Sequence, residues 1–373
     1  MSRIFIDCRC LQSPPPRGGV GVVAEQLTRH LLAIDRTNEY LLFANGLGNT
    51  ARHLPPFEAP NARWHITHWP NKVWNGVACG PRQLPRLPDA DVVFLPNLNF
   101  LPPLHPRTRF VVMVHDLSFA HFPECFTPKQ RLWHRCIRPA QLLARAHAIV
   151  AVSHTTAHDI VDTYGILEQR IHVISPGLTP APVSATHPID ERYRLPSRFL
   201  LTLSAGEPRK NIDGCIAAFA RAATIPELRN LHLVIAGIAG SATRALRRII
   251  AHSPVRNRIH CIGPIPESEK HALYAHAECF VYPSIWEGFG IPPLEAMMAG
   301  TPVVSSTGGA LPEILGDAAL LVDPLDPGAI ARAIIRACTN PTLRSTLITR
   351  GHHRASRFRW EDAATRLHHL LTA

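Results

Sequence analysis

Short apolar runs alternate with helical patterns from one end of the 373-residue chain to the other. Strands that alternate with helices run parallel, because each connection has to cross back over the sheet. In the first half we predict strands at residues 3–8, 40–44, 91–95, 109–114, 148–152 and 171–174. In the second half we predict strands at residues 199–204, 231–236, 258–262, 278–282, 302–305 and 319–322. The sequence therefore predicts an α/β protein built on two parallel sheets.

A segment rich in proline and serine, residues 175–188, separates the two halves and is typical of an interdomain linker. A chain of this length has room for two domains of ordinary size. We predict one Rossmann-like domain over residues 1–178 and a second over 179–355, facing each other across a cleft. A ligand in that cleft would touch strand ends from both domains.

Composition limits the kind of partner. Lys and Arg outnumber Asp and Glu by 39 to 28, and the net charge of +11 is spread over both halves. Nucleic-acid binders concentrate their charge on one face or tail, so an even excess favours anionic ligands or an anionic membrane surface. No run approaches the roughly 18 to 20 apolar residues that span a bilayer, and the first residues are typical of a strand and not of a signal peptide. Nine cysteines without CxxC pairs fit buried thiols, so we expect a protein of the cytoplasm or of the inner face of the cytoplasmic membrane.

The segment Glu287-Gly-Phe-Gly-Ile-Pro-Pro-Leu-Glu295 places two carboxylates eight residues apart around a glycine-rich turn that follows a predicted strand. Pro292 suits the first turn of a helix, where its missing N–H leaves no gap in the hydrogen bonding. Turns from strand to helix bind ligands in α/β proteins. We expect Glu287 in the turn and Glu295 in the helix, and carboxylates that accept hydrogen bonds suit a sugar or a ribose.

Two other strand-to-helix turns carry groups that suit an anion. Gly18, Gly19 and Gly21 precede a predicted helix at 22–32 and would let backbone amides approach a phosphate, although a plain flexible turn explains them equally well. Their spacing differs from the GxGxxG dinucleotide fingerprint. Arg209 and Lys210 follow the predicted strand 199–204 and would neutralise a diphosphate; the alternative is a solvated pair of charges.

His115 and Asp116 follow the very apolar strand 109–114. A histidine just past a strand end can point at a substrate, but a structural role is more common for a lone histidine. The residues alone leave both interpretations open.

No metal site is predicted. Asp89-Ala-Asp91 matches the DxD pattern of metal-dependent sugar transferases, but it precedes a strand, whereas such metal motifs end one. We interpret it as a connection from a helix to a strand. The histidines show no HExxH or other zinc spacing.

Residues 128–146 carry Arg131, Arg135 and Arg138 at helical spacing. Such a helix could lie on an anionic membrane surface, or it could be the polar face of an ordinary helix.

Taken together, these turns resemble the GT-B retaining glycosyltransferases of family 4. In the first half the resemblance rests on Arg17-Gly-Gly-Val-Gly21 and Val114-His-Asp-Leu-Ser-Phe119. In the second half it rests on Glu207-Pro-Arg-Lys-Asn211, Pro283-Ser-Ile-Trp-Glu-Gly-Phe-Gly290 and Gly300-Thr-Pro-Val-Val304. The resemblance implies a GT-B fold whose second domain holds a nucleotide sugar and whose first domain faces the acceptor. It also implies that the last helix, within residues 356–373, packs back on the first domain.

The resemblance assigns roles to individual residues. Glu295 would accept hydrogen bonds from ribose hydroxyls, and Glu287 would face the donor sugar. Lys210 and Arg209 would hold the diphosphate, and His115 would contact the sugar. We expect the charge of Lys210, which matters for catalysis, to lie across the cleft from the glutamate pair. The remaining residues implied in substrate or nucleotide binding are Gly18, Gly19, Asp116, Gly288, Phe289 and Gly290.

One departure from the family affects the diphosphate. Many members carry an arginine immediately after the first strand of the second domain, where this chain has Ser204 and Ala205. Either Arg209 takes that role or one cation is missing.

The resemblance implies transfer of a sugar with retention of configuration, without a cofactor or a divalent ion. Stabilising the charge on the departing diphosphate would be the main catalytic contribution. The motifs resemble bacterial mannosyltransferases of surface polysaccharide assembly, which favours GDP-mannose as donor and a glycan or lipid-linked acceptor. A UDP-sugar donor remains open. A nucleotide-sugar epimerase and a non-catalytic nucleotide-sugar binding module are the rival functions.

Overall fold

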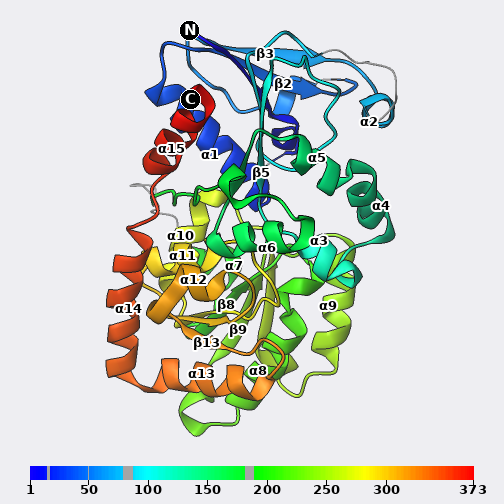
Figure 1. The fold of residues 1–373 in the computed structure, drawn as a ribbon. Helices are drawn as coiled ribbons and strands as arrows, with labels where there is room; N and C mark the ends of the chain where they lie inside the picture. Colours follow the sequence, from blue (N-terminus) through cyan, green and yellow to red (C-terminus); the bar gives the residue numbers. More distant parts are fainter. Residues whose placement is uncertain (15–16, 49, 79–86, 181–188) are drawn as a thin grey trace. The chain divides into compact units, whose positions relative to one another are not determined.

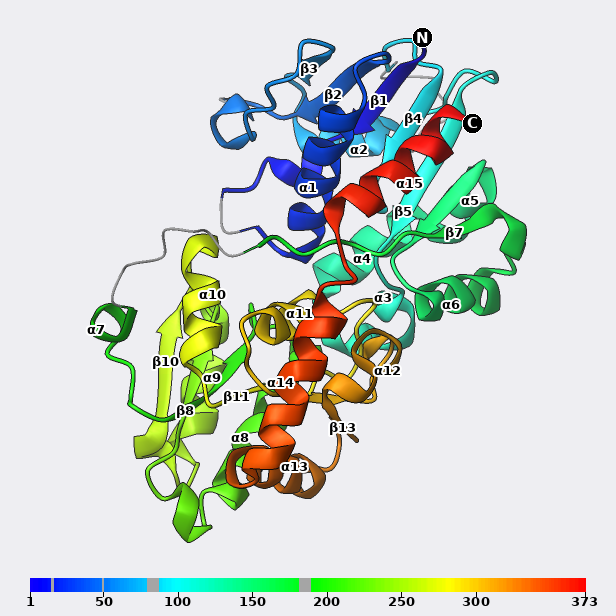
Figure 2. The same cartoon turned by 90° about the vertical axis from the view of Figure 1, so that its left-hand side faces the viewer.

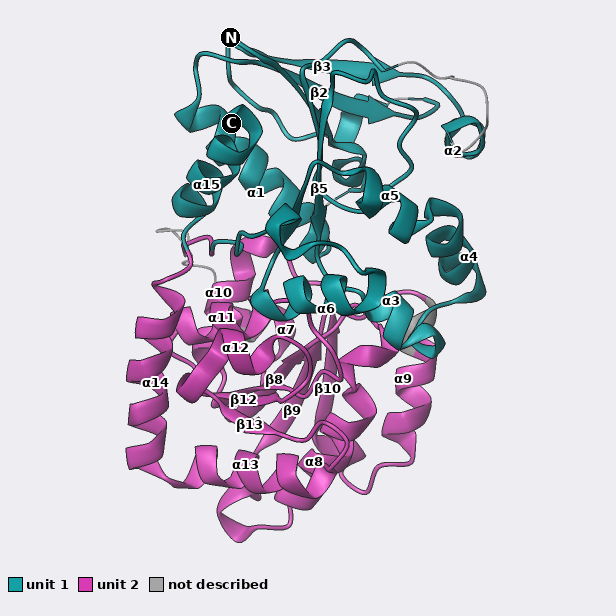
Figure 3. Ribbon diagram, viewed as in Figure 1, with its two compact units in different colours: residues 1–177, 359–373 teal, residues 178–358 magenta. Residues whose placement is uncertain are grey.

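In the computed structural model, the described residues are 1–14, 17–48, 50–78, 87–180 and 189–373. They form two compact units (Figure 3). Unit 1 contains Met1–Gly177 together with Arg359–Ala373, and unit 2 contains Leu178–Phe358. The predicted linker at 175–188 spans this division, and its second part lies outside the described residues.

Unit 1 is built on a seven-stranded parallel sheet with the strand order β3-β2-β1-β4-β5-β6-β7. Its central strands are continuous apolar runs, as expected for strands covered on both faces; Phe110 to Val114 of β5 are at most 2% exposed. The strands are β1 (Arg3–Asp7), β2 (Glu39–Asn45), β3 (Ala62–Thr67), β4 (Val92–Leu95), β5 (Arg109–Val114), β6 (Ala148–Ala151) and β7 (Ile171–Val173).

Helices cover this sheet, and the last helix of the chain belongs to unit 1. It lies beside the first helix in both views (Figures 1 and 2), and Trp360 at its start stacks on His30 of that helix. The helices are α1 (Gly19–Ile34), α2 (Asn71–Ala78), α3 (Ser118–His121), α4 (Pro128–Ile137), α5 (Pro139–Arg145), α6 (His154–Tyr164) and α15 (Trp360–Thr372).

Unit 2 is built on a six-stranded parallel sheet with the order β10-β9-β8-β11-β12-β13. The strands are β8 (Phe199–Leu203), β9 (His232–Ala236), β10 (Ile259–Gly263), β11 (Cys279–Tyr282), β12 (Val303–Ser306) and β13 (Leu320–Val322). Two helices, α8 (Ile212–Ala222) and α13 (Pro327–Thr339), contact each other and share a core with the central strands.

The other helices of unit 2 are α7 (Ile189–Tyr193), α9 (Ser241–Ala251), α10 (Glu267–His276), α11 (Ile291–Met298), α12 (Leu311–Leu315) and α14 (Pro341–Ala355). Helix α11 contacts α10 and α14, and it also contacts strands β11 and β12 (Figure 2). Helix α11, the first helix after β11, is therefore packed against two other helices and two strands of unit 2.

The α/β prediction of two parallel, Rossmann-like sheets is confirmed. Each predicted strand matches an observed strand to within one residue at either end. Strand β3 was not predicted. It alternates Ala62, Trp64 and Ile66 with polar residues and lies at the edge of the sheet, whereas the prediction rested on continuous apolar runs.

Three local expectations were wrong. Helix α1 begins at Gly19, so Gly19 and Gly21 lie inside its first turn and only Gly18 precedes it. The single helix expected over 128–146 is two helices, because Arg138 before Pro139 adopts a left-handed φ of 54°. Buried thiols were expected, yet Cys136 and Cys261 are exposed.

Candidate active site

The candidate site of unit 2 lies where the order of the strands reverses. From β8 the sheet continues to β9 on one side, while β11 and then β12 lie on the other. Connections from two such neighbouring strands leave toward opposite faces, which opens a crevice at their carboxyl ends. The segment after β8 carries Arg209 and Lys210, and the segment after β11 carries Glu287.

Glu287 is the centre of a buried cluster of charges. Its Oε1 lies 2.6 Å from Nζ of Lys210, and its Oε2 lies 3.0 Å from a guanidinium nitrogen of Arg209. The Glu287 side chain is 8% exposed and those of Lys210 and Arg209 are 11% and 18% exposed. The structure therefore brings together three predicted site residues and leaves the cluster a net charge of +1.

The placement of Lys210 differs from the expectation. Lys210 was expected across a cleft from the glutamate pair, but it lies in the same unit as Glu287 and contacts it. The reason is that β8 and β11 are hydrogen-bonded neighbours, so the segments that follow them emerge at the same edge of the sheet.

Two residues that the sequence analysis did not single out complete the cluster. The Ser284 hydroxyl lies 2.5 Å from Oε1 of Glu287, and the Tyr282 hydroxyl lies 3.0 Å from the same oxygen. Lys210 also donates to the Tyr282 hydroxyl, and its ammonium lies 4.9 Å from the centre of the Tyr282 ring. Tyr282 ends β11, and polar residues at the end of an apolar strand were the available signal.

These contacts control the protonation of Glu287. Burial raises its pKa, but the charges of Lys210 and Arg209 and the hydrogen bonds from Lys210 and Ser284 outweigh burial and lower the pKa to about 2. Burial, and next the charge of Glu287, raise the pKa of Tyr282 well above its ordinary value. At neutral pH the cluster therefore contains a carboxylate that accepts hydrogen bonds and cannot donate a proton.

A pair of glycines after β12 shapes the loop that carries Glu287. A Cβ on Gly309, which has a φ of +60°, would lie 2.3 Å from the carbonyl oxygen of Glu287. A Cβ on Gly308 would lie 2.2 Å from the carbonyl oxygen of Ile285. The amide of Ala310 donates to the Glu287 carbonyl at 2.8 Å. The close approach of these two loops requires glycine, and a Gly-Gly pair one residue beyond a strand could have indicated it.

The residues between Glu287 and helix α11 form the turn that was predicted. Gly290 precedes the helix with a φ of 108°, and Pro292 and Pro293 lie in its first turn. Phe289 is 6% exposed and its ring packs edge-on against Phe358. Gly288, Phe289 and Gly290 thus connect the charge cluster to the positive end of α11.

Glu295 lies within α11, as expected, and has surroundings of its own. The hydroxyl of Tyr274 on α10 donates to its Oε2 at 2.9 Å. Burial raises the pKa of Glu295, the charge of Lys270 lowers it, and Glu267 raises it. The second predicted glutamate is therefore less strongly ionised than Glu287.

The predicted residues of unit 1 lie at the carboxyl edge of its sheet. His115 follows β5, and its Nε2 lies 2.8 Å from the carbonyl oxygen of Pro96, which follows the neighbouring strand β4. A carbonyl only accepts, so Nε2 carries the proton and Nδ1 is left as an acceptor. Burial lowers the pKa of His115, so the neutral ring is favoured.

Asp116 and the two glycines have different local roles. One carboxylate oxygen of Asp116 accepts from both the amide and the hydroxyl of Ser118, at 2.9 and 2.5 Å, and so starts helix α3. Gly18 and Gly19 are exposed at the start of α1, and a Cβ on either would meet nothing within 4 Å. The backbone at this helix start is open to an approaching ligand.

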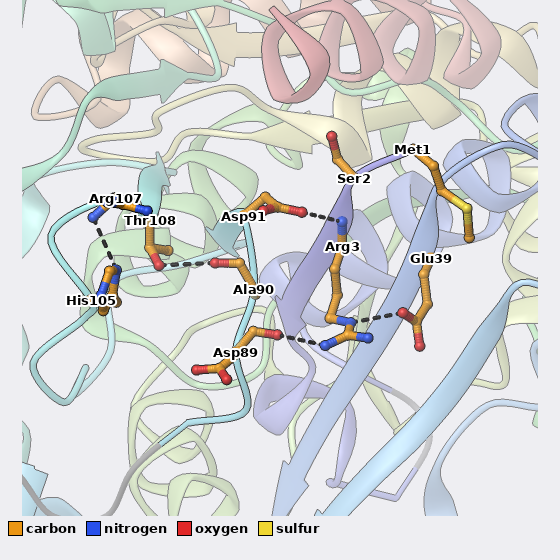
Figure 4. A pocket seen from close by; sticks show the side chains of 10 residues that line it. All are labelled: Met1, Ser2, Arg3, Glu39, Asp89, Ala90, Asp91, His105, Arg107 and Thr108. Carbon is orange, nitrogen blue, oxygen red and sulfur yellow. Dashed lines mark hydrogen bonds and ion pairs between the residues drawn. The ribbon is translucent and has the colours of Figure 1, made fainter.

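A pocket of about 670 Å³ lies at the amino edge of the unit 1 sheet, before the starts of β1, β2, β4 and β5 (Figure 4). Arg3 crosses it to reach Glu39 at 2.7 Å, and the Asp91 carboxylate accepts from the Arg3 amide at 2.7 Å. Asp89 and Asp91, the DxD pair, therefore lie in the connection that enters β4. Ligands of parallel sheets bind at the carboxyl edge, so this pocket is not the candidate site.

The described residues show neither a metal-binding cluster nor a membrane-spanning helix. They contain no group of three or more His, Cys, Asp or Glu side chains arranged to hold a metal ion. In the same part of the chain, no helix has the length and apolar character needed to cross a membrane.

Comparisons with known proteins identify the family. The model of "Glycosyltransferase Family 4" matches residues 17–181, and the model of "Glycosyl transferases group 1" matches residues 187–354. O-antigen chain mannosyltransferase B of Escherichia coli is 32% identical over 272 residues, which cover 72% of this chain and 71% of that protein. The chain belongs to the family 4 glycosyltransferases. It is therefore an enzyme of sugar transfer.

Two further comparisons place this family 4 glycosyltransferase among longer relatives and solved structures. Serotype-specific mannosyltransferase WbdA of Escherichia coli is 31% identical over 227 residues, and the match covers 59% of this chain and 28% of that protein. HepE of Anabaena, solved in complex with UDP-glucose, superposes with a TM-score of 0.72 at 19% identity, covering 100% of both chains. The second likeness supports the GT-B fold.

Proposed function

We propose that the protein transfers mannose from GDP-mannose, with retention of configuration, to a glycan or lipid-linked acceptor in the assembly of a bacterial surface polysaccharide. The observation that carries this proposal is the buried cluster of Lys210, Arg209 and Glu287 at the carboxyl edge of β8 and β11. Its net positive charge suits a diphosphate. The names of the two mannosyltransferase relatives support the sugar.

In this proposal Lys210 stabilises the departing diphosphate. The ammonium has three N–H groups, and among the described residues two of them have partners, the Tyr282 hydroxyl and the Glu287 carboxylate. The third N–H is left for a phosphate oxygen. Because the ammonium is already held in place by two acceptors, little reorganisation is needed when the charge develops on the leaving group.

Glu287 orients the donor sugar and does not act as an acid. Its Oε1 accepts from three side chains, whereas within the described chain Oε2 accepts from Arg209 alone. Oε2 therefore has a lone pair left for a sugar hydroxyl. The Glu287 carboxyl group, with a pKa of about 2, is ionised at neutral pH. In this proposal Glu287 therefore does not protonate the leaving group.

In unit 1 the proposal assigns roles to His115 and to the start of α1. The neutral His115 ring offers Nδ1 to a hydroxyl of the sugar, and the backbone at Gly18 and Gly19 offers amides to an anion. Asp116 acts through the turn that it forms with Ser118. No cofactor or metal takes part in this scheme.

A UDP-sugar is the alternative donor, since the structural neighbour HepE was solved with UDP-glucose. Isothermal titration of GDP, UDP, GDP-mannose and UDP-glucose, followed by assay of sugar transfer to a panel of glycan acceptors, tests both donors. We expect GDP-mannose to bind and to be consumed, and NMR of the product to show the anomeric configuration of the donor. Isomerisation of the donor without an acceptor would instead favour the epimerase, and full function of a Lys210→Ala variant in vivo would favour the binding module.

Contact with an anionic membrane is part of the proposal, because a lipid-linked acceptor lies at such a surface. Helix α4 exposes Arg131, Leu132 and Arg135, and the Leu132 side chain is 58% exposed. Cosedimentation with vesicles of phosphatidylglycerol should exceed that with phosphatidylcholine, and Arg131→Glu with Arg135→Glu should abolish the difference. Equal sedimentation with both vesicles would contradict a membrane role for α4.

A further inference from the structure

Glu295 is held by helix α10 rather than by its own helix. The Tyr274 hydroxyl donates to Oε2 of Glu295 at 2.9 Å, and Tyr274 is 1% exposed. The tyrosine is itself fixed, because its ring packs edge-on against Phe280 and its carbonyl accepts from the Thr301 hydroxyl at 2.6 Å. One oxygen of Glu295 therefore has a set direction.

The same face of α10 carries two charges beside Glu295. Glu267, Lys270 and Tyr274 follow one another at intervals of three and four residues, which places them on one side of the helix. Nζ of Lys270 lies 2.8 Å from Glu267, and the Lys270 side chain is 18% exposed. Lys270 is close enough to Glu295 for its charge to lower the pKa of that carboxyl group.

The other oxygen of Glu295 is available. Within the described chain, Oε1 of Glu295 has no hydrogen-bond partner, whereas Oε2 is engaged by Tyr274. When one oxygen of a carboxylate is held by a hydrogen bond, the other oxygen has a defined position. A group with a defined position can select between ligands that differ at a single hydroxyl.

We infer that Tyr274 is a positioning residue for the nucleoside of the donor: it anchors Oε2 of Glu295 so that Oε1 meets a ribose hydroxyl, and Lys270 supports the carboxylate from the side. This inference rests on the proposed function, since it requires a nucleoside diphosphate at this site. It adds to that function a source of selectivity for ribose, built on α10, that is separate from the diphosphate cluster around Lys210.

The chain offers a matched control for Tyr274. Tyr193 on α7 also donates to a glutamate of α10, since its hydroxyl lies 2.5 Å from Glu269. Tyr193→Phe and Tyr274→Phe thus remove the same atom and the same type of hydrogen bond at the same helix. Only the second change affects Glu295.

The test compares GDP and UDP with their 2′,3′-dideoxy analogues by isothermal titration. For the nucleotide that binds the wild type, we expect Tyr274→Phe to weaken binding of the ribose form about tenfold and to leave the dideoxy form nearly unchanged. Tyr193→Phe should leave both unchanged. Equal losses for both forms, or no loss for either, would overturn the inference while leaving the proposed function in place. Failure of the wild type to bind GDP or UDP would overturn both.

A second variant keeps the inference testable if Tyr274→Phe does not fold. Lys270→Met removes the charge that opposes the effect of burial on Glu295, so the pKa of Glu295 should rise further. Binding that needs the ionised carboxylate is lost as pH falls through that pKa. The pH at which nucleotide binding is lost on acidification should therefore rise by about one unit in Lys270→Met, whereas Lys129→Met, the control, should leave it unchanged. The same pH for loss of binding in Lys270→Met and wild type would contradict the inference.

Discussion

Lys210 and Glu287 are separated by 77 positions in the chain, yet Nζ of one lies 2.6 Å from Oε1 of the other. Both side chains are largely buried, so neither charge is well solvated. A buried ion pair of this kind is strongly disturbed when one partner is removed, because the other charge is left without compensation. The pair therefore ties the stability of unit 2 to the groups that we propose for catalysis.

Removing the ammonium should reduce sugar transfer. Lys210→Met keeps the length of the side chain and removes the charge proposed to face the leaving diphosphate. We expect a loss of about 10² to 10³ in the rate of transfer, the range found when one donor to a developing negative charge is deleted. Lys72→Met, at an exposed position of α2, is the control and should retain the wild-type rate. A wild-type rate for Lys210→Met would remove this residue from the mechanism.

Neutralising Glu287 should destabilise the protein in a way that depends on pH. The folded pKa of about 2 lies below the ordinary value of 4.5, so the carboxylate stabilises the fold above pH 4.5 and this contribution is lost as pH falls toward 2. The difference corresponds to about 3 kcal/mol. We expect urea unfolding of Glu287→Gln to show a loss of this size at pH 7 and a smaller loss at pH 3.5. A loss that did not change with pH would mean that packing, and not charge, holds Glu287.

Gly309 should not tolerate a methyl group. Gly309→Ala would place Cβ 2.3 Å from the Glu287 carbonyl and would also strain the backbone at a φ of +60°. Gly165→Ala separates the two effects, because Gly165 has a φ of +63° and a Cβ there would meet nothing within 4 Å. We expect Gly165→Ala to cost about 1 kcal/mol in the free energy of unfolding. Gly309→Ala should lower the free energy of unfolding by more than this and should also lower the transfer rate. Equal losses in the two variants would show that the loop of Glu287 accommodates the added methyl group.

His115 should lose its proton at a lower pH than an ordinary histidine does. Burial lowers its pKa below the ordinary value of 6.5, so its NMR signals should titrate only below that pH. His115→Ala should reduce kcat/KM for transfer by about tenfold, since it removes the proposed acceptor for a sugar hydroxyl. His158→Ala, at an exposed position of α6, should have no effect. Titration of His115 at or above pH 6.5 would contradict the buried, neutral ring.

The sheets could be predicted because their strands are continuous apolar runs, and the same reasoning missed β3. The Arg63 side chain of this edge strand is 65% exposed and pairs with Glu39 at 2.8 Å, so the apolar run is interrupted. The break between α4 and α5 was visible in principle, since Pro139 disfavours a helical Arg138.

The candidate site could be predicted only in part. Motif spacing indicated Arg209, Lys210 and Glu287 separately, but their mutual contact depends on which strands are neighbours. Tyr274 could not have been found from the sequence, because its partner Glu295 lies on another helix and the contact depends on how α10 and α11 pack.

The chain leaves unit 1 after Gly177 and returns to it at Arg359, and the two crossings are close together within each unit. In unit 2 the amide of Leu178 donates to the carbonyl of Phe358 at 3.0 Å, and in unit 1 a Cβ on Gly177 would lie 2.2 Å from the amide nitrogen of Trp360. Unit 2 is thus an insertion whose two ends meet. A block exchange of residues 178–358 between relatives would need only two junctions, side by side, and would carry the complete Lys210–Glu287 cluster and the α10–Glu295 contact into a new host.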